Sequence, residues 1–127
     1  MILGVGVDIL DCRRIQKLFL NFPERFVRKV FTKTERMLFE KRNFDIATIA
    51  KIFAIKEGVI KAISDISGAS WHDIEVLHDE IGKPFVKLRN VALAKAEKKS
   101  LGGEFKFEVS VSDELPYVCA FVIFEAL

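Results

Sequence analysis

The chain has 127 residues, of which 50% are hydrophobic and 30% charged, and its formal net charge is +2 at pH 7. A chain of this length is expected to fold as a single domain, residues 1–127, with a core that needs no disulfides. The composition excludes a disordered chain, and no apolar run reaches the ~18 residues of a membrane span. Since the N-terminus lacks a signal-peptide pattern, we expect a cytoplasmic protein.

The first half of the chain predicts one strand and four helices. Residues 2–10 are apolar and rich in β-branched side chains, and Gly4 and Gly6 among them suit either close approach to another backbone or a β-bulge. Each predicted helix has residues suited to its first turn, namely Asp11, Pro23, Thr32 with Glu35 as a capping box, and Asp45. The last of these helices is long and apolar and is expected to end near residue 64.

The second half of the chain predicts antiparallel strands. Residues 73–79 and 85–89 are typical of strands joined by a turn at Gly82 and Pro84. A helix over 90–101 and strands over 105–112 and 117–126, with a turn at 113–116, complete the pattern. We therefore expect an α+β fold in which a hairpin-built antiparallel sheet wraps around the long central helix.

The segment KIFAIKEGVIKAI, residues 51–63, carries three charges at the centre of an apolar helix. Successive helical residues advance by about 100°, which places Glu57 and Lys61 on one stripe among small residues. This stripe is either a solvated edge or the floor of a groove with room for a ligand. The i,i+4 pair alone, which contributes about 0.2–0.5 kcal/mol to a helix, does not separate these alternatives.

Asp8 is a second unexpected charge, because it lies in the apolar strand at residues 2–10. It needs a cation or a donor, or else it lies at the strand's exit and accepts N–H bonds from the next helix. Asp8 and Glu57 together offer hard carboxylates without His or Cys nearby, which suits Mg²⁺ rather than zinc. With Lys56 and Lys61 supplying positive charge, these residues indicate a phosphoryl-transfer site.

Four segments in this order, GVGVDIL, FAIKEGVIKAI, DIEVLHDEIGKPFVKL and VSVSDELPYVCAFVI, cover essentially the whole chain. They resemble the holo-[acyl-carrier-protein] synthases of the 4′-phosphopantetheinyl transferase family. The resemblance implies that family's fold and a homotrimer with sites at subunit interfaces. It also implies an Mg²⁺-dependent transfer of the phosphopantetheine arm of coenzyme A to a serine of apo acyl carrier protein. The products would be 3′,5′-ADP and the holo carrier protein used in fatty acid biosynthesis.

The resemblance also implies roles for individual residues. Asp8 and Glu57 would hold Mg²⁺, and Lys61 would neutralise phosphate charge or help the leaving group depart. The serine hydroxyl would be deprotonated by metal-bound water or by Glu57. The coenzyme A site would include Lys56, Lys61, Gly82, Lys83, Pro84, Ser112 and Asp113. Asp113 stands where many members have His, and Ile52 stands where many have Arg.

Residues 13–42 contain ten Lys or Arg and only three Glu, a local net charge of +7. This asymmetry indicates an acidic partner, although a solvated surface with counter-charges elsewhere explains it equally well. The resemblance implies docking of the carrier protein, with candidates Arg13, Arg14, Lys17, Arg25 and Arg28. A competing nucleic-acid-binding module would need exposed aromatic residues here, and a catalytically inactive interaction subunit is a third reading. Because the Phe residues fall at roughly helical spacing, we expect core packing and no nucleic-acid partner.

Overall fold

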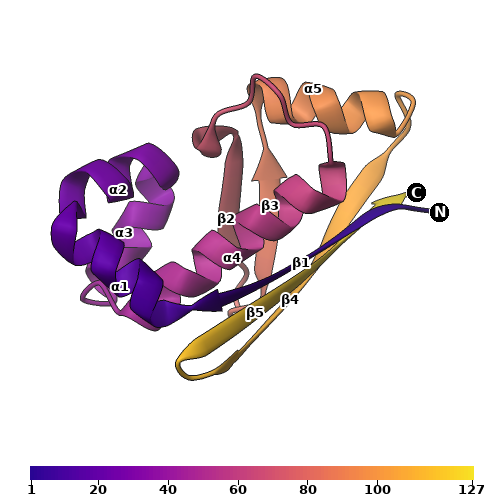
Figure 1. Ribbon diagram of the computed structural model, residues 1–127. Coiled ribbons are helices and arrows are strands. Elements are labelled where there is room, and N and C mark those ends of the chain that lie inside the picture. Colours follow the sequence, from indigo (N-terminus) through magenta and orange to yellow (C-terminus); the bar gives the residue numbers. More distant parts are fainter.

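A computed structural model describes all residues, 1–127. Strand β1 (Ile2–Asp11) leads into three short helices at one end of the molecule, α1 (Cys12–Asn21), α2 (Pro23–Val30) and α3 (Lys33–Lys41) (Figure 1). The long helix α4 (Ile46–Ile63) follows, and then a 3₁₀ turn, η1 (Trp71–Asp73). The remaining elements are β2 (Ile74–His78), β3 (Pro84–Leu88), α5 (Asn90–Lys99), β4 (Phe105–Glu114) and β5 (Tyr117–Ala126). None of the helices is both long and apolar enough to cross a membrane.

The strands form two antiparallel sheets that pack against α4. One sheet has the order β1-β5-β4, and the other is the β2–β3 hairpin. Figure 1 shows α4 lying across these strands, with α5 beyond its C-terminal end. This arrangement confirms the predicted α+β fold around a long central helix, with the sheet divided into two. The predicted turn at 113–116 is shorter than expected, because β4 continues through Glu114.

The predicted helix caps are present. The Asp11 carboxylate accepts the Arg13 backbone N–H at 2.9 Å. Thr32 and Glu35 form the reciprocal capping box at the start of α3, with bonds of 3.3 and 2.9 Å. Asp45 caps α4 by accepting the backbone N–H three residues further on, at 3.2 Å. Each cap satisfies N–H groups that have no partner within the helix, which explains why the helices begin at these residues.

Helix α4 supplies the centre of the hydrophobic core. Its buried apolar residues are Ile49, Ala50, Ile52, Ala54, Ile55, Val59, Ala62 and Ile63. Phe31 and Phe39, from the basic segment, are fully buried and meet edge to face with ring centroids 4.8 Å apart. Phe26 is also buried and Phe19 is partly buried, so these four rings pack in or against the core, as their helical spacing predicted. Phe22, in contrast, is 51% exposed, and core packing was wrong for it.

Strand β1 lies against α4 with no side chains between the two backbones. A Cβ atom on Gly6 would overlap the carbonyl oxygen of Gly58, and one on Gly4 would overlap that of Ala62. On the helix side, a Cβ on Gly58 would lie only 2.8 Å from a methyl group of Val122 in β5. The glycines of the first strand are therefore required by the close approach of strand and helix, as the sequence predicted.

We expect Gly6→Ala to destabilise the protein by about 3 kcal/mol, because the new methyl group must push β1 away from α4. The free energy of unfolding from urea titration measures this effect. Gly103→Ala is the matched control, since its Cβ would lie 3.3 Å from the Ser100 carbonyl oxygen, at an exposed turn. Its stability should stay within about 1 kcal/mol of the parent. Equal effects of the two substitutions would contradict the close contact.

Candidate active site

Asp8 lies two residues after Gly6 on β1, so its side chain projects from the same face of the strand, towards α4. Its side chain is only 15% exposed. Lys61 of α4 donates from Nζ to the Val7 carbonyl oxygen at 2.8 Å and to Asp8 Oδ1 at 3.3 Å. The buried carboxylate thus has a cationic partner, and it is not used as a cap for the next helix, because Asp11 fills that position.

Glu57 lies one turn before Lys61 on the same stripe of α4, as the helical periodicity predicted. Its carboxylate is half-buried and makes no salt bridge in the structure. Burial raises the pKa of Glu57, the negative charge of Asp8 raises it further, and the Lys61 ammonium opposes these effects. The structure therefore brings Asp8, Glu57 and Lys61 together, with more negative charge than the single ammonium balances.

The two carboxylates fit a hard divalent cation. No group of three or more His, Cys, Asp or Glu side chains is arranged to hold a metal by itself. Mg²⁺ does not need such a group, since it commonly binds one or two carboxylates and completes its shell with water and substrate phosphates. The raised pKa of Glu57, which results in part from Asp8, indicates that a cation between them would relieve their repulsion.

Lys56, predicted for the coenzyme A site, does not line the cavity or any other open surface of the structure. Its side chain is 0% exposed and forms an ion pair with Glu35 at 2.6 Å. Its ammonium also donates to the Val30 carbonyl oxygen at 2.8 Å. Burial lowers the pKa of Lys56, and the Glu35 carboxylate opposes this shift. Lys56 is adjacent to Glu57 in the sequence, but its side chain points in another direction around the helix, into the core.

A cavity of about 490 Å³ opens between α3, α4 and the β2–β3 turn. Gly82 and Pro84, both predicted for the coenzyme A site, line it. Lys41, Arg42, Lys51 and His78 also line it, together with the acidic residues Asp79 and Glu80. Burial lowers the pKa of His78, and the positive charge of Arg42 adds to this effect. Three Lys or Arg side chains therefore stand against two carboxylates, a small excess of positive charge that favours an anionic ligand such as a phosphate ester.

The sheet connects this cavity to Asp8. Val111 of β4 lines the cavity. It pairs with Ala120 of β5, and Ala120 pairs on its other side with Asp8 of β1. Two strand spacings, roughly 10 Å, therefore separate the cavity wall from the Asp8 backbone. An extended ligand with phosphates at both places can span this distance.

Of the other predicted residues, Lys83 and Asp113 lie near the cavity, whereas Ser112 lies on the opposite face of β4 from Val111, which lines it. Lys83 is exposed, and its ammonium lies 3.6 Å from the Glu108 carboxylate. Asp113 forms an ion pair at 2.9 Å with Lys51, a residue that lines the cavity. Its carboxylate is therefore associated with the cavity and not with the Asp8 side of the site. Ser112 is exposed and pairs in register with Cys119. The cationic residues Lys41, Arg42 and Lys51 were missed as site residues. The only signal for the first two was their position at the end of the basic segment.

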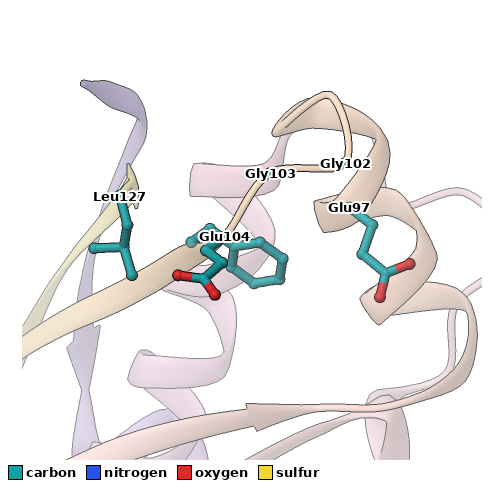
Figure 2. Close-up of a pocket in the computed structure, with 6 residues that line it drawn as sticks. Glu97, Gly102, Gly103, Glu104 and Leu127 are labelled. Carbon is teal, nitrogen blue, oxygen red and sulfur yellow. The ribbon is translucent and has the colours of Figure 1, made fainter.

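A second hollow, of about 400 Å³, lies near the chain termini and has the opposite charge (Figure 2). Figure 2 shows the Glu97 side chain on helix α5 and the Glu104 side chain on the strand side of the hollow. Two carboxylates and no cation line this hollow, so it would repel a phosphate group. None of the predicted site residues contributes to it.

The five docking candidates are all exposed on α1 and α2, namely Arg13, Arg14, Lys17, Arg25 and Arg28. Arg13 is held by Asp11, with Nη2 and Oδ2 2.7 Å apart, and this ion pair lowers the pKa of Asp11. The side chains of the other four make no salt bridge within the chain. These free cations form a basic surface on the end of the molecule that the three short helices build.

Comparisons with known proteins show the family to which the chain belongs. Residues 4–122 match the family described as the 4′-phosphopantetheinyl transferase superfamily. A holo-[acyl-carrier-protein] synthase of Paramagnetospirillum magneticum is 41% identical, over 99% of this chain and 98% of its own length. The crystal structure of the Neisseria meningitidis synthase superposes with a TM-score of 0.86, at 35% identity, over 98% of this chain and 99% of its own. A Bacillus anthracis synthase, solved in complex with coenzyme A (3′,5′-ADP), has a TM-score of 0.79 and 27% identity, over 100% and 99% of the two chains.

Proposed function

This chain belongs to the 4′-phosphopantetheinyl transferase superfamily, and we propose that Asp8, Glu57 and Lys61 form its transfer site. It transfers the phosphopantetheine arm of coenzyme A to apo acyl carrier protein, as its similarity to holo-[acyl-carrier-protein] synthases over the full chain indicates. The observation that carries the site assignment is the meeting of these three residues across the contact between β1 and α4.

Asp8 and Glu57 would hold Mg²⁺, which would neutralise charge on the pyrophosphate of coenzyme A as its bond to the leaving group breaks. Lys61 places its ammonium beside the same carboxylates and would bind a phosphate oxygen or stabilise the departing 3′,5′-ADP. The serine proton would be accepted by Glu57 or by water at the site, and the half-buried Glu57 carboxylate makes no salt bridge that would compete for it.

The cationic cavity would bind the 3′,5′-ADP part of coenzyme A. Its basic residues Lys41, Arg42 and Lys51 would pair with phosphate groups, and Gly82 and Pro84 would form an open wall. Lys83 and Asp113 lie close to this wall and would form its rim. A contact of Ser112 with coenzyme A stays a prediction, because its side chain lies on the outer face of the sheet. Transfer for fatty acid biosynthesis in the cytoplasm stays a prediction from the family resemblance.

Intact mass spectrometry of apo carrier protein, incubated with this protein, coenzyme A and Mg²⁺, tests the transfer site. We expect the mass of one phosphopantetheine arm to be gained, and the gain to be lost with EDTA.

Asp8→Asn and Glu57→Gln should each slow transfer by at least about 100-fold, because the phosphate charge is no longer balanced. Glu97→Gln, which removes a carboxylate from the hollow in Figure 2, is the matched control and should transfer normally. Full activity of both site variants would refute the metal site.

The exposed cations of α1 and α2 would dock the carrier protein. We expect the double variant Arg14→Glu/Arg25→Glu to raise KM for the carrier about tenfold with little change in kcat, because these residues orient the partner and take no part in the chemistry. Neither side chain is in a salt bridge, so the substitutions break no contact within the chain. Lys98→Glu, on exposed α5, is the control and should leave KM unchanged. The difference in KM for the carrier between wild type and variant should shrink as salt is added. A difference in KM that does not depend on salt would count against electrostatic docking.

The outer face of the β1-β5-β4 sheet would form a homotrimer interface. Val5, Val7 and Ile9 are 54%, 53% and 70% exposed, and Phe121, opposite Val7 in the register, is 42% exposed. A contiguous apolar face of this kind marks a protein–protein contact. Since Asp8 lies between Val7 and Ile9 on the same strand, a copy packed on this face would also lie close to the transfer site.

We expect native mass spectrometry to give three times the 14.5 kDa chain mass, and Ile9→Lys to shift the protein towards monomer, because a buried ammonium on the apolar face is costly. Leu101→Lys is the control, since Leu101 is 94% exposed in the turn after α5. A monomeric parent protein, or an Ile9→Lys variant that remains trimeric, would show that the interface lies elsewhere or does not exist.

A further inference from the structure

The ion pair between Lys56 and Glu35 is the most deeply buried pair of charges in the molecule. Both side chains are 0% exposed, and their charged atoms lie 2.6 Å apart. Glu35 also accepts the backbone N–H groups of Thr32 at 2.9 Å and Val76 at 2.7 Å. Lys56 also donates to the Val30 carbonyl oxygen at 2.8 Å. No buried polar side-chain atom is left without a partner.

Stability alone does not account for this pair. Removing two charges from water costs about as much as their attraction returns, and apolar residues of similar size often serve as well or better. An ion pair differs from apolar packing in its directional demands, because its atoms must meet at one distance and angle. The pair therefore suits a place where an element must sit in a single orientation.

The position of Lys56 around α4 shows that the pair can fix the rotation of this helix about its own axis. At about 100° per residue, Gly58 and Ala62, which touch β1, lie roughly 200–240° around the helix from Lys56. The helix is thus held on two nearly opposite sides, by backbone contact with β1 and by the Lys56 ammonium. Glu57 lies between these two sides, about 100° from Lys56, so a rotation of α4 would move its carboxylate relative to Asp8.

We propose that the Lys56–Glu35 pair is a positioning device that fixes the rotation of α4 and thereby directs Glu57 and Lys61 towards Asp8. This inference rests on the proposed assignment of Glu57 and Lys61 to the transfer site. Neither Lys56 nor Glu35 touches the substrate, and both act through the helix.

The same carboxylate connects other walls of the site to α4. Glu35 is part of the capping box of α3, the helix that leads to the basic residues Lys41 and Arg42 of the cavity. Through the Val76 N–H, Glu35 is also bonded to β2, whose hairpin carries Gly82. A single buried side chain therefore sets α3, α4 and the β2–β3 hairpin relative to one another.

The test removes both charges while keeping the size of the side chains, in the double variant Glu35→Gln/Lys56→Met. Lys56→Met alone leaves the Glu35 carboxylate buried without its cation and should lower Tm strongly. The double variant should recover most of that Tm, because no unpaired charge remains. Its kcat should nevertheless stay about ten- to hundredfold below wild type, with KM for the carrier within about threefold, because the reacting groups are misplaced.

A purely structural pair would behave differently, since kcat would recover together with Tm. A double variant with wild-type Tm and kcat within twofold of wild type overturns the proposal. Phe39→Leu, a core substitution on the same α3 helix, is the control for lost stability and should keep its kcat while folded. If the double variant does not fold at the assay temperature, the single variant Glu35→Gln takes its place, because it keeps the side chain's size and one acceptor oxygen. A Glu35→Gln variant with wild-type Tm and kcat within twofold of wild type likewise overturns the proposal.

The Glu57→Gln variant separates this inference from the proposed function. A folded double variant with wild-type kcat, beside an inactive Glu57→Gln, overturns the positioning of α4 alone. A Glu57→Gln variant that transfers at the wild-type rate overturns both, because there would be no reacting group for the pair to position.

Discussion

Direct contact between the backbones of β1 and α4 is the constraint on which the site depends. Glycines at positions 4 and 6 let the strand touch the helix at Gly58 and Ala62, so no side chain sets the spacing. Asp8 follows two residues later and meets Lys61 and Glu57 at a distance that the backbones determine. Reacting groups must be held to within about half an ångström, and groups on a rigid strand and helix are placed more accurately than groups on loops. The helix accepts Gly58 for this purpose, at a cost of about 1 kcal/mol in helix propensity.

Charge is divided between two neighbouring places in the fold. The cavity between α3, α4 and the β2–β3 turn is cationic, whereas Asp8 and Glu57 make the end of the site near β1 anionic. A ligand with phosphates would be drawn to the first place and repelled from the second unless a cation lies between its phosphates and the carboxylates. The proposed Mg²⁺ would supply this cation. At the edge of the cavity, the ion pair of Asp113 with Lys51 reduces the positive charge.

The parts of this structure that could be predicted from the sequence depend on local interactions. Helix caps such as Asp11 and the Thr32–Glu35 box involve residues within one turn, and the alternation of β4 reflects the two faces of one sheet. The convergence of Asp8 with Glu57 was also predicted, since each is a carboxylate in an apolar element and needs a charged neighbour.

The direction of Lys56 could not be predicted in the same way, because its partner Glu35 lies 21 residues away on another helix. A lysine beside a reactive glutamate in the sequence suggests a shared site, but on a helix adjacent residues point about 100° apart. The cationic cavity was missed for a related reason. Lys41, Lys51 and His78 come from separate elements, and only tertiary packing brings them to one wall.

The three charges at the centre of α4 therefore have three different environments. Lys61 reaches past the end of the buried surface to bond a strand carbonyl and a carboxylate, so its ammonium is half-exposed and can meet an incoming anion. Glu57 is half-buried beside another acid, which raises its pKa and leaves it short of positive charge. Lys56 is fully buried, where a charge is tolerated only because Glu35 and a carbonyl oxygen satisfy it. The backbone contact with β1 holds α4 on one side, and the Lys56–Glu35 pair adds a directional contact on the other. The third charge supplies the direction that the other two need, and for that reason it belongs in the core.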